Sequence, residues 1–311
     1  MKKEITVFAP ASVTNVSCGF DIMGFAIDGP GDELKLKISN KPGIVISKIT
    51  GDRGKLPLQI EKNTAGTSIS ALAQHLNFKK GIDIEIHKKM SLASGLGSSA
   101  ASAVAGVFAL NEILGNPLSK EELLPFALEG EKITCGGAPH ADNVSASLYG
   151  GFIIVRSLKP LDVINIDVPE NLYCTIVHPD IEIHTGDTRK ILKKQILLSD
   201  AVQQWGNVAS LVAGLLKKDY KLIGRSLQDV IVEPIRSILI PGFNDVKQAA
   251  LDAGALGCSI SGSGPSIFAF SNSKRVAKII GDKMQNVLSR LEIESDLYIS
   301  KINKEGPRII K

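Results

Sequence analysis

The chain has 311 residues, of which 44% are hydrophobic and 22% charged, and its formal net charge is +4. This length suggests two domains, and the composition excludes wholesale disorder. Aromatic residues make up only 5%, and the densest basic pairs, such as Lys88-Lys89, are short. Nucleic-acid binding is typical of a basic stripe with stacking aromatic residues, so we expect no nucleic-acid partner and favour a small anionic substrate.

Nothing in the sequence predicts a membrane segment or a secretory leader. Residues 90–111 are uncharged and long enough to span a bilayer, but serine and glycine crowd the first half of this stretch. The N-terminus leads into a strand-like segment without an apolar leader core. Cys18, Cys135, Cys174 and Cys258 lie far apart, which gives no zinc or redox spacing. We expect free thiols and a cytoplasmic location.

Periodicity predicts alternating strands and helices in the first half of the chain. Strands are expected at 5–8, 33–39, 44–49, 82–87 and 152–155, and helices at 67–76 and 98–114. Residues 10–24 are small and polar and are expected to form a loop. Ser119 and Glu122 have the spacing of a capping box at the start of a further helix.

The second half predicts a strand at 173–177, helices across 187–239 and at 244–253, a strand-turn-strand at 258–270, a helix at 273–291 and a last strand at 297–301. Strands and helices mix without a run of βαβ units, which favours the α+β class over a doubly wound sheet. We expect the domain boundary between residues 155 and 172, with domains at 1–160 and 161–311.

Residues 94–101, Ser-Gly-Leu-Gly-Ser-Ser-Ala-Ala, form the most specific motif. Glycine lets backbone N–H groups approach an anion closely, and the helix that follows directs its positive end at the same point. Ser98 and Ser99 add hydroxyl groups for phosphate or Mg²⁺. The loop lacks the lysine of a Walker P-loop and does not fit the dinucleotide-binding glycine pattern. The alternative is a turn of small residues before a tightly packed helix.

Two other segments are rich in small polar residues. Residues 10–21, Pro-Ala-Ser-Val-Thr-Asn-Val-Ser-Cys-Gly-Phe-Asp, follow the first strand, and residues 259–266, Ser-Ile-Ser-Gly-Ser-Gly-Pro-Ser, join two apolar runs. Taken alone, the first is best interpreted as a surface loop. The second is equally a plain hairpin or a second wall around bound phosphates.

Together, and in this order, the three segments resemble those of the GHMP kinases, a family of ATP-dependent small-molecule kinases. Four further features resemble the branch that phosphorylates L-homoserine: Asn15 with Gly19-Phe20-Asp21; Pro139-His140-Ala141-Asp142-Asn143 before Gly150-Gly151-Phe152; His184-Thr185 with Arg189-Lys190; and Asp229-Val230-Ile231-Val232-Glu233-Pro234-Ile235-Arg236 before Pro241-Gly242-Phe243. The resemblance covers most of the chain. It implies an N-terminal domain like ribosomal S5 domain 2 and a ferredoxin-like C-terminal domain.

The resemblance also implies ATP and Mg²⁺ as cofactors. The residues implied in cofactor binding are Asn63, near the adenine, and Ser94, Gly95, Leu96, Gly97, Ser98, Ser99, Ala100 and Ala101. Those implied at the metal are Ser98, Ser99 and Glu131, with Glu129 as the alternative acid. Those implied in binding the amino acid are Asn15, Asp21, His140, Thr185, Arg189 and Arg236.

The catalytic residues that the resemblance implies are Asp21, Asn143 and Glu131. Mevalonate kinase-like members have an aspartate near Asn143, so this branch implies a site without a dedicated base. Asp21 would orient the hydroxyl while the γ-phosphate takes the proton, unless Asp21 is itself the base. The implied product is O-phospho-L-homoserine, for threonine biosynthesis.

Other functions remain open at this stage. Arg189 and Arg236 favour a substrate with a carboxylate over a sugar. A mevalonate-type kinase of the same family, or a binding relative without catalysis, would share the motifs. A homodimer is possible.

Overall fold

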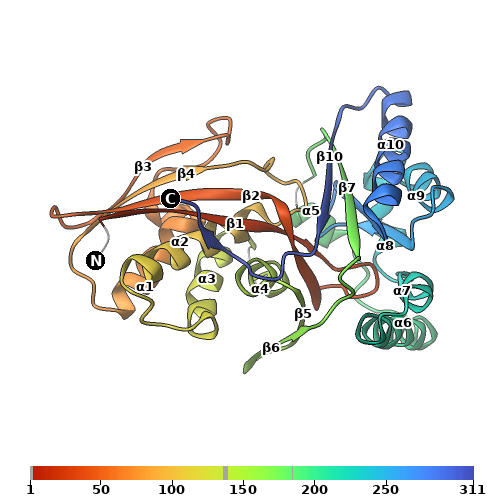
Figure 1. The fold of residues 1–311 in the computed structure, drawn as a ribbon, viewed down its shortest axis with the longest axis horizontal. Coiled ribbons are helices and arrows are strands. Elements are labelled where there is room, and N and C mark those ends of the chain that lie inside the picture. The colour runs from red at the N-terminus through yellow and green to blue at the C-terminus, as the bar shows by residue number, and fades with distance from the viewer. Residues whose placement is uncertain (1–2, 136–138, 184) are drawn as a thin grey trace.

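Residues 3–135, 139–183 and 185–311 are described in the computed structural model, and two sheets organise them (Figure 1). The larger sheet has seven strands in the order β11-β1-β2-β4-β3, with β5 paired to β2 and β6 paired to β5. Its strands are β1 (Glu4–Thr14), β2 (Met23–Ser39), β3 (Ile44–Thr50), β4 (Gly81–His87), β5 (Phe152–Leu158), β6 (Leu161–Ile166) and β11 (Arg308–Ile309). Among the described strands, only β3 and β4 pair in parallel.

Four helices pack on one side of this sheet (Figure 1): α1 (Thr64–His75), α2 (Ser98–Ile113), α3 (Lys120–Cys135) and α4 (Ala141–Tyr149). Nearly every residue of α2 is buried, because it packs against α1, α3, α4 and the sheet at once. Its alanine-rich sequence allows this close approach on all sides. The capping box before α3 is confirmed: Ser119 N donates to Glu122 Oε2 (2.8 Å), and Glu122 N donates to Ser119 Oγ (3.3 Å).

The smaller sheet has the antiparallel order β10-β7-β9-β8. Its strands are β7 (Tyr173–Pro179), β8 (Gly257–Ile260), β9 (Ile267–Ser271) and β10 (Ser295–Lys301). The helices of this half are α5 (Thr185–Lys190), α6 (Leu198–Lys217), α7 (Tyr220–Ser226), α8 (Glu233–Arg236), α9 (Phe243–Asp252) and α10 (Lys274–Arg290). A βαββαβ order with this strand arrangement is the ferredoxin-like motif, so the expected α+β class is confirmed.

The expected loop at residues 10–24 is wrong at both ends. β1 continues to Thr14 and β2 begins at Met23. Ser12 and Thr14 are buried, at 0% and 1% exposure. Both faces of the sheet are covered at this point, so the strands carry no alternation of polar and apolar residues that the sequence could reveal. The helix α4 and the strand β6 were likewise not predicted.

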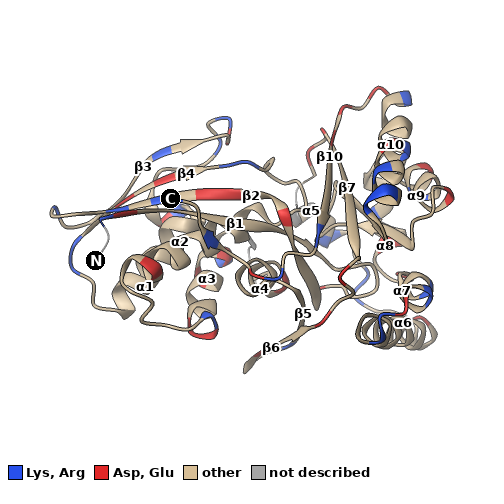
Figure 2. Cartoon of the chain, in the orientation of Figure 1, with Lys and Arg blue, Asp and Glu red and all other residues tan. Residues whose placement is uncertain are grey.

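One hydrophobic core connects the two sheets. The ring of Phe25 on β2 stacks on Phe152 of β5 at 5.9 Å, and it also contacts Phe268 and Phe270 of β9 at 6.2 and 5.1 Å. β6 pairs with β5 and is therefore part of the larger sheet. We therefore propose that the domain boundary lies between residues 166 and 173, slightly beyond the boundary expected at residue 160. Acidic and basic residues are interspersed over both halves (Figure 2).

Candidate active site

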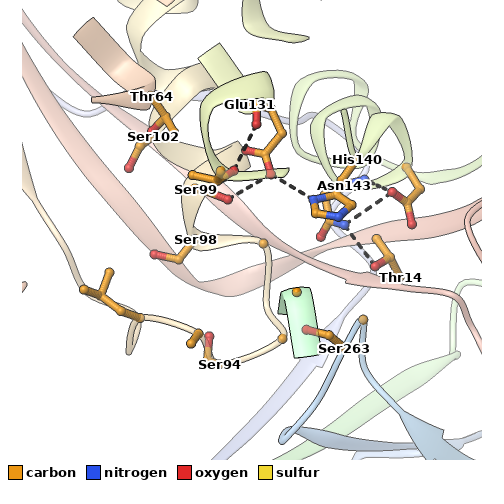
Figure 3. A pocket seen from close by; sticks show the side chains of 18 of the residues that line it. Thr14, Thr64, Ser94, Ser98, Ser99, Ser102, Glu131, His140, Asn143 and Ser263 are labelled. Carbon is orange, nitrogen blue, oxygen red and sulfur yellow. Dashed lines mark hydrogen bonds and ion pairs between the residues drawn. The ribbon is translucent and has the colours of Figure 1, made fainter. Parts of the chain in front are cut away.

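A cavity of about 430 Å³ is lined by residues of both halves of the chain (Figure 3). This volume lies within the range of small-molecule sites. The predicted site residues that line it are Asn15, Asp21, Asn63, Ser94, Gly95, Gly97, Ser98, Ser99, Glu131, His140, Asn143, Arg189 and Arg236. Sequence positions from 15 to 236 are therefore brought to one place.

The glycine-rich loop turns sharply into α2. Gly97 is the residue before the helix and has φ +66°, and Gly95 has φ +77°. A Cβ at Gly97 would lie 2.1 Å from Ser12 Oγ, and one at Gly95 would lie 2.5 Å from the carbonyl oxygen of Ser261. Only glycine combines these dihedral angles with so close an approach. The first N–H groups of α2 have no carbonyl one turn earlier, and the cavity lies at this end of the helix.

The three polar segments meet at this loop. Ser12 N donates to Leu96 O (3.0 Å), and Gly262 N donates to Thr14 O (3.1 Å). Ser261 Oγ donates to Gly95 O at 2.7 Å. The interpretation of residues 10–21 as a plain surface loop is therefore wrong, and residues 259–266 form a wall of the site rather than an isolated hairpin.

Glu131 of α3 faces the start of α2. It is 1% exposed, and its Oε1 accepts a hydrogen bond from Ser99 Oγ (3.1 Å) and lies 3.1 Å from Nδ1 of His140 (Figure 3). Glu129, the alternative acid, is instead exposed and forms an ion pair with Lys132. Of the two acids, Glu131 alone lines the cavity.

The guanidinium groups of two arginines lie near one aromatic ring. The guanidinium carbons of Arg189 and Arg236 lie 5.8 and 4.9 Å from the ring centroid of Phe20. Arg189 is exposed and donates to Asp21 Oδ1 (2.8 Å), whereas Arg236 is 3% exposed. Arg236 donates to the carbonyl oxygen of Gly262 (3.2 Å), but its buried Nε has no partner. Burial lowers the pKa of Arg236 to about 10, and the charge of Asp21 partly opposes this shift.

Asn143 is held by three neighbours. Ser12 Oγ donates to its Oδ1 (3.0 Å), and its Nδ2 donates to Thr14 Oγ1 (3.1 Å) and to Asp142 Oδ1 (3.3 Å). Asp142 also lines the cavity and is 3% exposed. Burial, and after it the charge of Asp21, raises the pKa of Asp142 to about 6.

Other predicted residues have structural contacts. Asn63 caps α1: its Oδ1 accepts from Ala65 N (3.1 Å) and Gly66 N (3.3 Å). Asn15 Nδ2 donates to Gly262 O (2.6 Å), and Asn15 Oδ1 accepts from Asp21 N (2.9 Å).

The remaining predicted positions do not face the cavity or cannot be placed. Leu96, Ala100 and Ala101 lie in the loop and α2 but do not line the cavity. Thr185 begins α5, and its side chain lies outside what the structure describes. Their expected contacts stay predictions.

Sequence reasoning missed Asp142, Asp32 and Lys88. Asp142 stands between the motif residues Ala141 and Asn143, and no local pattern indicates that it is buried. Asp32 and Lys88 stand next to the strands expected at 33–39 and 82–87, at positions where a charged residue is usually exposed. Among the described residues, no group of three or more His, Cys, Asp or Glu side chains is placed to hold a metal, and no helix is long and apolar enough to cross a membrane.

Known proteins are similar to this chain in sequence and in fold. Family models described as GHMP kinases N terminal domain and GHMP kinases C terminal match residues 63–151 and 211–290. A homoserine kinase of Chloroherpeton thalassium is 52% identical over 99% of this chain and 100% of its own length. A homoserine kinase of Xylella fastidiosa is 37% identical over 99% of this chain and 94% of its own length.

Solved structures agree. The crystal structure of a homoserine kinase from Cytophaga hutchinsonii matches with a TM-score of 0.98 and 61% identity, covering 100% of this chain and 98% of that one. Mevalonate kinase of L. major, solved with R-mevalonate, shares the fold with a TM-score of 0.74 and 19% identity, over 97% of this chain and 98% of its own. The chain therefore belongs to the GHMP kinase family.

Proposed function

We propose that this protein transfers the γ-phosphoryl group of ATP to the hydroxyl group of L-homoserine and releases O-phospho-L-homoserine and ADP. The observation that carries the proposal is the position of Arg236, a buried guanidinium with an unpartnered Nε, in the same cavity as the start of α2. Its relatives named homoserine kinase, 52% and 61% identical, support the same substrate.

Homoserine carries a carboxylate, an ammonium group and a hydroxyl, and the cavity has a counterpart for each charge. Arg189 and Arg236 would bind the carboxylate, because guanidinium groups pair with carboxylates through charge-assisted hydrogen bonds. Asp21 and Asp142 would face the ammonium group. Asp21 would then exchange part of its contact with Arg189 for the substrate. Phe20 lies within cation–π distance of both guanidinium groups.

The ATP phosphates would lie at the start of α2, where N–H groups without helical partners and the helix dipole favour an anion. Ser99 and Glu131 would bind Mg²⁺, since their oxygen atoms already lie 3.1 Å apart. Proteins hold this ion through one or two side chains together with substrate phosphates, so a larger protein cluster is not needed. Bound there, Mg²⁺ would neutralise charge on the β- and γ-phosphates.

In the transfer, the homoserine oxygen forms a bond to the γ-phosphorus as the bond from that phosphorus to the bridging oxygen breaks. The hydroxyl proton passes to a γ-phosphate oxygen. Asp21 orients the hydroxyl in this scheme and forms an ion pair with Arg189. Asn143, fixed by Ser12 and Thr14, cannot accept a proton and would align the reacting groups.

The alternative within the family is a mevalonate-type kinase. Mevalonate has a carboxylate for the arginines but no ammonium group for Asp21 and Asp142, which would leave the buried Asp142 without a positively charged partner in the substrate. A binding relative without catalysis would have no need for both Ser99 and Glu131 at the start of α2. Action in the cytoplasm and a homodimeric state stay predictions.

A coupled assay of ADP release tests the proposal with homoserine, mevalonate, galactose and shikimate as acceptors. Turnover with homoserine should exceed that with the others. Arg236→Leu should raise the homoserine KM by a factor equivalent to about 2–5 kcal/mol and leave the ATP KM nearly unchanged. Arg225→Leu, at an exposed position on α7, is the control. An unchanged homoserine KM in Arg236→Leu contradicts the carboxylate assignment.

A further inference from the structure

A buried ion pair lies directly beneath the start of α2. Asp32 stands on β2, and Lys88 follows the last residue of β4. Both side chains are 1% exposed, and Lys88 Nζ contacts Asp32 Oδ2. Lys88 also lines the cavity, next to Ser98 and Ser102. Neither charged residue has a part in the phosphoryl transfer described above.

The ion pair is connected to the first turn of α2 by hydrogen bonds. Lys88 Nζ donates to the carbonyl oxygen of Ser98 and to Ser102 Oγ, both at 2.7 Å. Ser98 Oγ donates to Asp32 Oδ2 at 3.2 Å. Asp32 Oδ1 accepts from Lys89 N at 2.9 Å, which connects the same carboxylate to the backbone after β4. The three N–H bonds of the lysine are all used, and both carboxylate oxygens are occupied.

These contacts give the two serines of the loop, Ser98 and Ser99, different partners. The hydroxyl proton of Ser98 points to Asp32, below the helix, whereas that of Ser99 points to Glu131. Figure 3 shows Ser99 directed at Glu131 and Ser98 on another side of the turn. The orientation of Ser99 depends on the rotation of the first turn about the helix axis, and the Asp32–Lys88 pair fixes that rotation through Ser98 and Ser102, one turn apart.

Fold stability does not account for a pair of this kind. Desolvation of two charges offsets most of their attraction, and apolar side chains of similar volume often replace a buried ion pair without loss of stability. A strand side chain at position 32 that faces the core of this sheet would ordinarily be apolar. The two charges therefore require another explanation. Their hydrogen bonds connect the pair to the first turn of α2, where the phosphates would bind, and to the backbone that follows β4.

We propose that Asp32 and Lys88 are positioning residues for ATP: they fix the first turn of α2 so that its N–H groups and the Ser99 hydroxyl face the phosphates and Mg²⁺. The inference rests on the proposed binding of ATP at this helix end. It assigns Ser98 to the scaffold and leaves Ser99, with Glu131, as the metal ligand.

The test compares two double variants. Asp32→Leu with Lys88→Met removes the charges and the hydrogen bonds while keeping similar volumes. We expect a folded protein whose kcat/KM for ATP falls by about 10–100-fold, the usual loss when a residue that orients a ligating group is removed. Asp32→Asn with Lys88→Gln keeps hydrogen-bonding groups and should recover most of this loss. The homoserine KM should change little in either variant.

The matched control is Lys35→Met with Glu85→Leu. This pair joins the same two strands, β2 and β4, but is half-exposed and does not line the cavity. Its ATP kinetics should equal those of the wild type. If the apolar variant at 32 and 88 folds with unchanged kcat and ATP KM, or if the Asn/Gln variant is as impaired as the apolar one, the positioning role is wrong.

Two further measurements keep the test decisive. If the apolar variant does not fold, Ser102→Ala removes one acceptor of Lys88 from the helix side and should still lower kcat/KM for ATP about tenfold; unchanged kinetics would overturn the proposal. The Kd of a non-hydrolysable ATP analogue with Mg²⁺, measured by calorimetry, should rise in the same variants. This binding experiment needs no homoserine turnover, so a failure of the proposed substrate is distinguished from a failure of the positioning role.

Discussion

At the scale of single residues, the first prediction concerns the contact between Ser99 Oγ and Glu131 Oε1 (3.1 Å). Glu131→Gln and Ser99→Ala should each lower kcat by about 10²–10³, because charge that develops on the phosphates would be less well neutralised. Circular dichroism should show an intact fold. Steady-state kinetics at saturating Mg²⁺ make the measurement. Glu129→Gln, on the exposed face of the same helix, should have no effect, and near-normal turnover of Glu131→Gln would remove Glu131 from the metal site.

The raised pKa of Asp142 predicts that both the stability of the protein and its affinity for homoserine depend on pH. Its pKa is raised to about 6, above the value near 4 of an unfolded chain, so the folded state holds the proton between these values. The contribution of Asp142 to stability therefore falls as the pH rises from about 4 to 6. Binding of the substrate ammonium requires the ionised carboxylate, so homoserine affinity should rise between about pH 5 and 7 and level off above pH 7.

The measurement is the homoserine KM between pH 5 and 8 for the wild type and Asp142→Asn. Asp142→Asn should bind homoserine weakly at every pH in this range, and its affinity should not rise near pH 6. A rise that persists unchanged in Asp142→Asn would belong to another group and would remove Asp142 from the ammonium site.

The site residues differ in how far the sequence could identify them. Gly95, Gly97, Ser98 and Ser99 stand together in one motif, and their backbone requirements can be read directly. Asp142 and Lys88 acquire their properties from burial and from partners distant in sequence, such as Asp21 and Asp32, and no local pattern reports either. The choice between Glu129 and Glu131 also required the orientation of α3.

At the scale of elements, the turn into α2 predicts that Gly97→Ala abolishes activity. The new Cβ would meet Ser12 Oγ at 2.1 Å and Asn143 Oδ1 at 2.7 Å, and the backbone would be strained at φ +66°. Gly115, at the other end of the helix, has φ +90° but nothing within 4 Å of an added Cβ. Gly115→Ala should therefore cost only the strain of a positive φ, about 1–2 kcal/mol, and keep full activity.

Thermal unfolding and turnover of the two glycine variants provide the comparison. Equal loss of activity in both would mean that general instability, and not the packing of the turn against Ser12 and Asn143, causes the effect. The comparison is matched because both glycines flank the same helix.

The elements themselves were predictable where one face is exposed. β4 alternates Ile82, Ile84 and Ile86 with polar residues and was found at 81–87. The ends of β1 and β2 near the site were not, because their side chains are buried on both faces and lack alternation. Near the site, the buried residues of β1 and β2 therefore lack the alternating pattern from which these strands could be predicted.

At the scale of the whole molecule, the contacts of Phe25 predict that the two sheets unfold together. Phe25→Ala removes a ring that touches both β5 and β9 and should cost about 3–5 kcal/mol. Amide hydrogen exchange should show loss of protection in both sheets. Phe126→Ala, at a half-buried position on α3 beside the larger sheet, should also lower protection in both sheets, because they unfold as one unit; loss confined to the larger sheet would contradict the prediction. Two separate transitions in calorimetry of the wild type would contradict a single cooperative unit.

The same cluster of Phe25, Phe152, Phe268 and Phe270 limits how the enzyme exchanges its ligands. A rotation of one half away from the other about a hinge would expose these rings to water, and each costs about 1.5–3 kcal/mol to expose. We therefore expect the backbone of the two sheets to stay fixed throughout the catalytic cycle. Nucleotide and amino acid would enter past the surface segments beside the cavity. One of these segments contains Leu56, which lines the cavity, and its neighbour Lys55 forms an exposed pair with Glu182 at 2.9 Å. The rate of product release would then depend on how fast such weak surface contacts break. The catalytic groups would keep their positions between one substrate and the next.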